Sequence, residues 1–169
     1  MWRRTLFYGL TSFGCAAVGY GLLAWALPGH HVFGAPYRML LYHEAHPLAY
    51  IGLCCVLFGP LAAMATEAFR RRAGWGRVGV LAVVALATLT LSAPLGGMLW
   101  YWHDMRVGYF PPHWVQRLLL AGGCDGLAVG WLVVLLSVPY NALGLAVGYG
   151  LLVAGVRRFP AGGSEEARP

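Results

Sequence analysis

Long hydrophobic runs, separated by short polar or Gly- and Pro-containing segments, dominate the pattern of this chain. A helix needs about 20 apolar residues to cross the hydrocarbon core of a bilayer. The pattern predicts five runs near that length, at about residues 5–27, 47–69, 78–101, 114–136 and 140–156. We therefore expect an all-α fold, a polytopic transmembrane helix bundle. One transmembrane domain would cover residues 1–159, and the Gly-, Pro- and Glu-rich tail over 160–169 would be disordered.

The last part of this pattern allows two topologies. A single straight helix over residues 114–156 would be about 60 Å long, twice the hydrocarbon thickness. The segment from Ser137 to Asn141 contains Pro139 and is the natural break. This break favours five crossings. The alternative is four crossings, with Trp114–Asp125 as a re-entrant or interfacial segment.

Composition excludes an ordinary soluble domain. Hydrophobic residues make up 59% of the chain and charged residues 11%, whereas soluble domains carry about 25% charged residues. The bilayer is therefore the expected solvent. The apolar run from Thr5 to Leu27 is longer than the 7–15 apolar residues of a signal peptide, so we expect it to remain as an uncleaved first crossing.

The formal net charge is +6, and all twelve basic residues are Arg. Most arginines stand at the ends of apolar runs, as in Arg3-Arg4 and Arg70–Arg72, instead of forming the single exposed face that nucleic-acid binding requires. Arginine is retained on the cytoplasmic side of membranes. The pattern predicts no nucleic-acid partner, a cytoplasmic N-terminus and a multi-pass protein of a prokaryotic cytoplasmic (inner) membrane. The exclusive use of Arg indicates a GC-rich genome.

Histidine is the first candidate for chemistry, because all six histidines fall in or beside two loops that the five-crossing topology places outside the cytoplasm. Imidazole and carboxylate together bind transition metals. His46 and His113 would open the second and fourth runs at similar depth, which would suit a b-type haem. The alternative is that these amphipathic rings only settle at headgroup depth. The candidate metal or haem ligands are His43, His46, His103, Asp104 and His113.

Asp125 is the second candidate, because it stands eleven residues into the fourth run, about 16 Å deep. A charge there costs at least about 2.5–3.5 kcal/mol, so such residues usually face the bundle interior and mark a transport pathway or proton relay. The alternative is a packing role, with Asp125 hydrogen-bonded to Thr88, Thr90 or Ser92.

Small residues recur every fourth position around Asp125 and in the next run. This spacing lets helix backbones approach closely in lipid, and it predicts that the last two runs pack against each other, a neighbouring run, another membrane subunit or a second copy. The glycines concerned are Gly122, Gly126, Gly130, Gly144 and Gly148.

One further pattern is local: Glu67 precedes Arg70 and Arg71 by three and four residues, which predicts ion pairs along one helix. The sequence contains no recognisable catalytic motif. We therefore expect a small transport or membrane-complex assembly component instead of an enzyme. The alternative is a metal- or haem-binding membrane protein that uses the histidines for redox chemistry or metal delivery.

Overall fold

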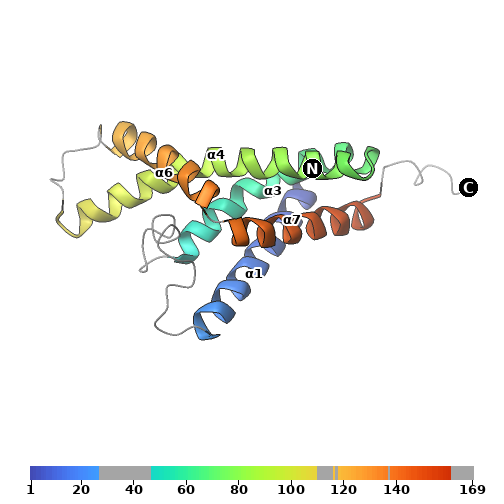
Figure 1. The fold of residues 1–169 in the computed structure, drawn as a ribbon, viewed down its shortest axis with the longest axis horizontal. Helices are drawn as coiled ribbons and strands as arrows, with labels where there is room; N and C mark the ends of the chain where they lie inside the picture. Colours follow the sequence, from blue (N-terminus) through green and yellow to red (C-terminus); the bar gives the residue numbers. More distant parts are fainter. Residues whose placement is uncertain (27–46, 110–115, 117, 137, 161–169) are drawn as a thin grey trace, which may run out of the picture.

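The computed structural model describes residues 1–26, 47–109, 116, 118–136 and 138–160, and every regular element among them is helical. This confirms the all-α prediction. A short π-helix, η1 (Leu118–Gly122), leads into α6 (Figure 1). The α-helices are α1 (Trp2–Ala26), α3 (Pro47–Arg71), α4 (Trp75–Arg106), α6 (Gly123–Leu136) and α7 (Val138–Arg158).

The helix boundaries follow the apolar runs, with one marked difference. Helix α4 extends past Tyr101 to Arg106 and continues through Pro94. The polar residues after Tyr101 do not break the helix, and the Val107 N–H still donates to the His103 carbonyl oxygen at 3.0 Å. The chain then turns at Gly108, whose φ of 88° suits glycine. Helix α6 ends at Leu136 and α7 begins at Val138, so the change of helix falls within the break that the sequence predicts.

Consecutive helices pack side by side, α1 on α3, α3 on α4 and α4 on α6. Close approach of α1 and α3 depends on two glycines. A methyl group at Gly59 would lie 2.9 Å from the Thr5 carbonyl oxygen and 3.3 Å from the Cα of Gly9. The absence of side chains at Gly9 and Gly59 therefore allows the two backbones to touch.

The buried core occupies the half of the bundle where α1, α3, α4 and α7 meet. Its large side chains are aromatic or branched, and they pack edge to face: the rings of Phe69 and Tyr149 have centroids 5.4 Å apart. Small residues of α3 fill the space between them. The buried members are Tyr8, Ala62, Ala63, Phe69, Leu81, Val84 and Leu152.

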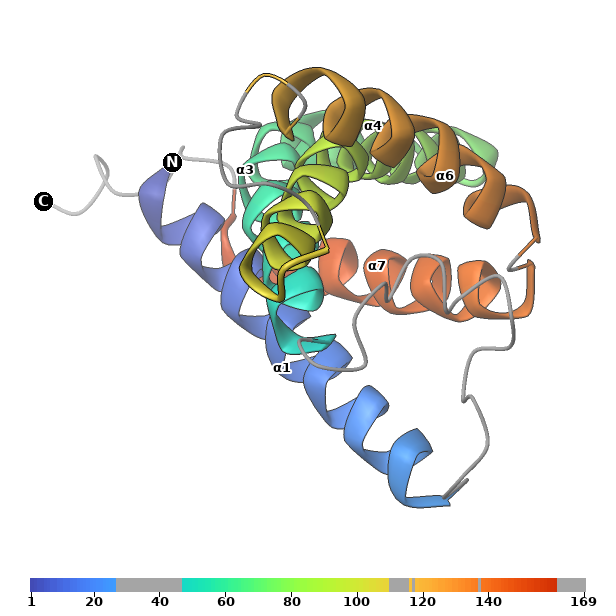
Figure 2. The same cartoon turned by 90° about the vertical axis from the view of Figure 1, so that its left-hand side faces the viewer.

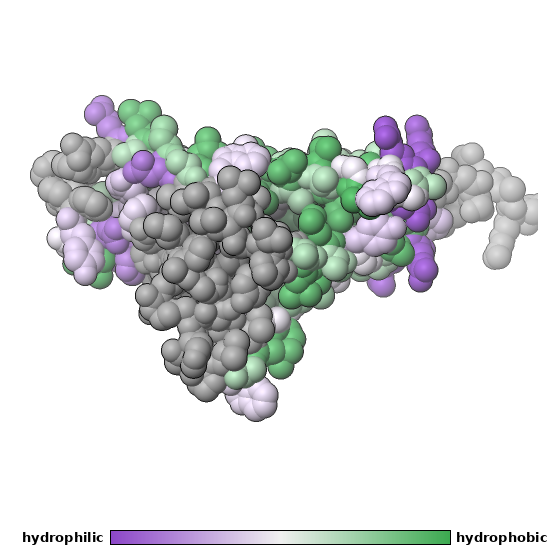
Figure 3. Space-filling model, viewed as in Figure 1, coloured by the Kyte–Doolittle hydropathy of each residue, from purple (hydrophilic) through white to green (hydrophobic). Residues whose placement is uncertain are grey.

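The start of α1 and the end of α7 lie at the same end of the bundle (Figures 1 and 2). The rings of Phe7 and Phe159 are in contact there, with centroids 5.6 Å apart. Helix α3 also ends here and α4 begins here, and hydrophilic side chains gather at this end (Figure 3). We call it the arginine end, and its members are Arg3, Arg4, Arg70, Arg71, Arg72, Arg77, Arg157 and Arg158.

Two of the described helices, Leu48–Arg71 and Trp75–Arg106, are long and apolar enough to cross a membrane. In the most apolar stretch of each, only 22% is buried inside the bundle. Most residues of these stretches are therefore at least partly exposed, and the space-filling view shows a hydrophobic surface over the middle of the molecule (Figure 3). Among the five predicted crossings, these two helices meet the requirement of length and apolarity.

Candidate functional site

The predicted site around Asp125 is built on an unusually close contact between α4 and α6. A methyl group at Gly126 would lie 2.7 Å from the Cα of Gly97, and one at Gly122 would lie 3.2 Å from the Gly97 carbonyl oxygen. Gly97, Gly122 and Gly126 are all buried. The two backbones therefore cross with nothing between them, and two of the predicted glycines, Gly122 at the end of η1 and Gly126 in α6, lie against α4.

This contact determines where Asp125 points. Gly122 and Gly126 occupy the positions that face α4, and one residue along a helix turns the side chain by about 100°. The side chain of Asp125 is consequently exposed on the outside of the α4–α6 pair. The expectation that Asp125 faces the bundle interior is therefore not met in the part of the chain that the structure describes.

The Asp125 carboxylate has a specific partner across this contact. The Tyr101 hydroxyl donates a hydrogen bond to its Oδ2 atom over 2.7 Å. This distance is typical of a well-formed hydrogen bond between two oxygens. Tyr101 lies five residues before the last residue of α4, about 8 Å along the axis, so Asp125 lies toward the end of α4 that is opposite the arginine end.

The Thr88 and Ser92 hydroxyl groups, two of the alternative partners expected for Asp125, donate to carbonyl oxygens of their own helix instead. Thr88 donates to the Val84 carbonyl oxygen at 2.8 Å and Ser92 to that of Leu89 at 3.2 Å. These are bonds within α4, of the kind that Thr and Ser often make to the preceding turn. The packing role weighed for Asp125 therefore involves Tyr101 and not these hydroxyls.

The predicted metal or haem ligands are only partly within the described structure. His43, His46 and His113 lie outside the described residues, whereas His103 and Asp104 lie in the last turn of α4. Among the described residues, no group of three His, Cys, Asp or Glu side chains is placed to hold a metal ion. The histidine hypothesis stays a prediction.

The glycine stripe of α7 differs from that of α6. A methyl group at Gly148 would lie 3.1 Å from Cδ1 of Leu81, whereas Gly144 has nothing within 4 Å. Gly130 lies in α6. Among the glycines of α7, Gly155 approaches another helix most closely, because a β-carbon there would collide with the Tyr8 side chain. Helix α7 thus packs against α1, α3 and α4, and only slightly against α6.

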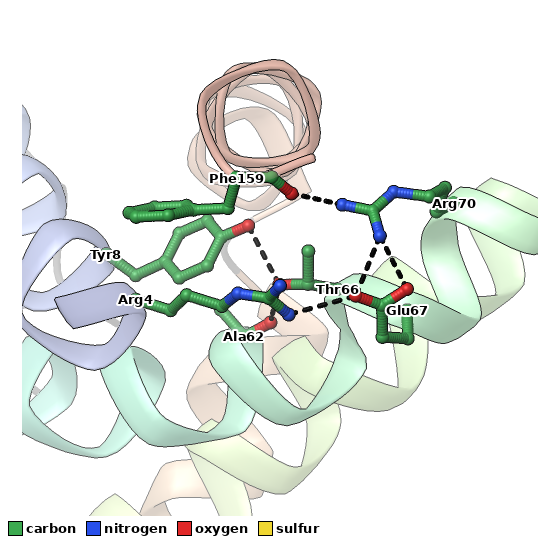
Figure 4. Close-up of polar contacts among 7 residues, drawn as sticks. All are labelled: Arg4, Tyr8, Ala62, Thr66, Glu67, Arg70 and Phe159. Atoms are coloured by element: carbon green, nitrogen blue, oxygen red, sulfur yellow. Dashed lines mark hydrogen bonds and ion pairs between the residues drawn. The ribbon is translucent and has the colours of Figure 1, made fainter. Parts of the chain in front are cut away.

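A second polar site lies at the arginine end (Figure 4), and the sequence analysis predicted only its Glu67–Arg70 ion pair, which the structure confirms. Glu67 accepts hydrogen bonds from Arg4 at 3.0 Å and from Arg70 at 2.6–2.7 Å. Arg70 also donates to the carbonyl oxygen of Phe159 just after α7. One carboxylate and two guanidinium groups therefore connect α1, α3 and the end of α7.

The same site contains a buried pair of hydroxyl groups. The Tyr8 and Thr66 oxygens lie 3.0 Å apart, and Thr66 is also 2.8 Å from the Ala62 carbonyl oxygen, to which it donates. Both side chains are fully buried. Because buried polar groups are costly when unpaired, these bonds fix how α1 and α3 align.

The sequence carried a signal for this site that was easy to overlook. Arg4 and Tyr8 are four residues apart, as are Ala62, Thr66 and Arg70, so each set shares one helix face. The sequence pattern predicted ion pairs of Glu67 with Arg70 and Arg71. The structure gives Arg70 and Arg4 as its partners, and Arg71 is exposed. The missing information was the alignment of α1 with α3.

Comparison of the chain with protein-family models, with curated proteins and with solved structures gives no match. The geometry of the two polar sites and the apolar surface are therefore the evidence for the function of this protein.

Proposed function

We propose that this chain is an integral protein of a prokaryotic cytoplasmic (inner) membrane and that it crosses the bilayer four times. Helices α1, α3 and α4 would each cross once, and α6 and α7 together would make the fourth crossing. Along the long axis of the bundle α6 and α7 both run toward the arginine end (Figure 1), although they are bent relative to each other (Figure 2). With 14 residues, α6 is about 21 Å long, shorter than the hydrocarbon core.

The contacts at the arginine end support four crossings over five. Five crossings would place the start of α1 and the end of α7 on opposite sides of the membrane. The Phe7–Phe159 contact and the bond from Arg70 to the Phe159 carbonyl oxygen support an arrangement in which both lie on the same side. Eight of the twelve arginines then share one face, which is cytoplasmic by the positive-inside rule.

Within the membrane, we infer that the protein is an assembly component that binds another membrane subunit through α6. The observation that carries this proposal is the exposed Asp125 carboxylate, held by Tyr101 on an otherwise apolar helix. Carboxylates at membrane depth are costly unless a polar group meets them. Because Asp125 faces outward, it suits a contact with a second protein better than a transport path through the bundle interior.

Cross-linking through Cys124 tests this proposal, because Cys124 is exposed and adjacent to Asp125. A variant that keeps only Cys124 would be treated with a bismaleimide in native membranes. We expect a discrete adduct with another membrane protein, and we expect Asp125→Asn to reduce its yield about fivefold, the effect of losing about 1 kcal/mol.

A variant that keeps only Cys15 is the matched control, because Cys15 is equally exposed but lies on α1. Its adducts should not respond to Asp125→Asn. If Cys124 forms no discrete adduct, or if its adduct survives Asp125→Asn unchanged, the assembly role is wrong.

A further inference from the structure

The arginine end carries far more positive charge than its internal contacts use. Glu67 is the only carboxylate among the described residues at this end, since Asp104 and Asp125 lie toward the opposite end of α4. It is shared by Arg4 and Arg70. Eight arginines therefore face one described carboxylate.

Several arginines of this end are held by neutral groups of the protein. Arg77 donates from Nε to the Arg72 carbonyl oxygen at 2.8 Å and lies over the Phe69 ring at 5.3 Å. The Arg158 guanidinium lies 5.5 Å from the centroid of the Phe7 ring. Such contacts orient a guanidinium group, but they leave its charge uncompensated.

The remaining guanidinium groups are exposed and come from three separate helix ends. Arg3 lies at the start of α1, Arg71 and Arg72 follow Arg70 at the end of α3, and Arg157 lies in the last turn of α7. The contact of Phe7 with Phe159 and the Arg70–Phe159 bond bring these three helix ends together. The result is a compact cationic surface and not a single basic segment.

Two exposed tryptophans indicate the depth of this cationic surface relative to the membrane. Trp2 begins α1 and is 71% exposed, and Trp75 begins α4 and is 87% exposed. Large exposed indole rings at the ends of apolar helices settle at the headgroup level of a membrane. Arg3, Arg71 and Arg72 stand within a few residues of these rings, and so they lie among headgroups when the protein is inserted.

We propose that the arginine end is a binding surface for anionic phospholipid headgroups. Arginine presents a planar fork of donors that matches a phosphate group in two bonds at once, and basic residues beside a membrane attract anionic lipids. Bound phosphodiester groups would supply the negative charge that Glu67 alone does not. This inference rests on the proposed insertion into the membrane, and it adds the class of lipid that the inserted protein retains.

The experiment compares lipid retention by purified protein reconstituted into nanodiscs of phosphatidylcholine with one-fifth phosphatidylglycerol. After gentle extraction into detergent, native mass spectrometry counts the phosphatidylglycerol molecules that stay bound. The variant Arg71→Gln/Arg72→Gln/Arg157→Gln removes exposed guanidinium groups from two helix ends. The matched control is Arg106→Gln, which removes an arginine from the opposite end of α4, where it lies over the Trp102 ring.

We expect the unmodified protein to be enriched in phosphatidylglycerol over phosphatidylcholine. Each arginine near an anionic surface contributes a factor of about five, so the triple variant should lose at least fivefold of this enrichment while Arg106→Gln keeps it. Equal retention by the two variants would overturn the inference. Displacement of the lipid by 10 mM inorganic phosphate would also overturn it, because the surface would then bind free phosphate.

This experiment also separates the inference from the proposal on which it rests. Incorporation of the protein into nanodiscs tests membrane insertion, whatever lipid is retained. A protein that enters nanodiscs without preference for phosphatidylglycerol would refute the lipid site and leave the four-crossing proposal standing. A protein that stays in the aqueous fraction without detergent would refute both.

Discussion

The hydroxyl groups of Tyr8 and Thr66 lie 3.0 Å apart between α1 and α3, near the arginine end, and both side chains are fully buried. Helix α7 covers this pair, because Gly155 lies directly against the Tyr8 side chain. Three helices thus meet at one tyrosine. Its hydroxyl oxygen is paired, and its ring fills the space that Gly155 leaves open.

Gly155→Ala should therefore destabilise the protein. The added methyl group has no free space beside the Tyr8 ring, and overpacking of this kind costs about 1–3 kcal/mol. Gly144→Ala on the same helix is the control, because nothing lies within 4 Å of a β-carbon there. Thermal unfolding in detergent should show a lower Tm for Gly155→Ala only. Equal Tm values for the two variants would show that α7 does not pack on Tyr8.

Gly126→Ala should weaken the contact of α6 with α4. A methyl group at this position would lie 2.7 Å from the Cα of Gly97, so the helices must separate. The Tyr101–Asp125 hydrogen bond spans the same contact and should lengthen with it. Gly19→Ala, in open space on α1, is the control. Unfolding in increasing SDS, followed by circular dichroism, should show a loss of about 1–3 kcal/mol for Gly126→Ala, and no loss there would contradict the close crossing.

The ion pair of Glu67 with Arg4 can be tested by a double-mutant cycle. The substitutions Glu67→Gln and Arg4→Gln should be coupled by about 0.5–1 kcal/mol in the free energy of unfolding, as is usual for partly exposed ion pairs. The same cycle with Arg71→Gln should give a coupling near zero, because Arg71 is exposed and does not bond to Glu67. High salt should reduce the first coupling. A larger coupling of Glu67 with Arg71 than with Arg4 would instead favour the Glu67–Arg71 pair that the sequence predicted along α3.

Reporter fusions test the four-crossing topology. Alkaline phosphatase should be active when fused after Tyr109, beyond α4, and inactive when fused after Pro160, beyond α7. Green fluorescent protein should fluoresce after Pro160 and also after Arg72, which serves as the cytoplasmic control. An active phosphatase after Pro160 would mean an odd number of crossings and would refute the shared cytoplasmic face.

The helices themselves could be predicted from the sequence, because the lengths of the apolar runs depend only on local composition. A break between α6 and α7 followed from the excess length of residues 114–156 and from Pro139, although α7 already begins at Val138 and includes Pro139. The direction of Asp125 could not be predicted in this way. Helix α6 is apolar on every side, so its periodicity does not indicate which face meets a neighbour.

The partner of Glu67 escaped prediction for a different reason. Arg70 is a neighbour along the same helix, whereas Arg4 is 63 residues away. The contact of Glu67 with Arg4 depends on the register of α1 along α3, and the close approach of Gly9 and Gly59 sets that register. The register depends on contacts between two helices, so it cannot be predicted from either apolar run alone.

The contact between Phe7 and Phe159 joins α1 to the residue just after α7, so the Tyr8 side chain is covered only when α7 is in place. A shortened form that lacks α7 would leave the Tyr8 ring and the Tyr8–Thr66 pair uncovered. Such a form should therefore be degraded by proteases faster than a form in which α7 is present.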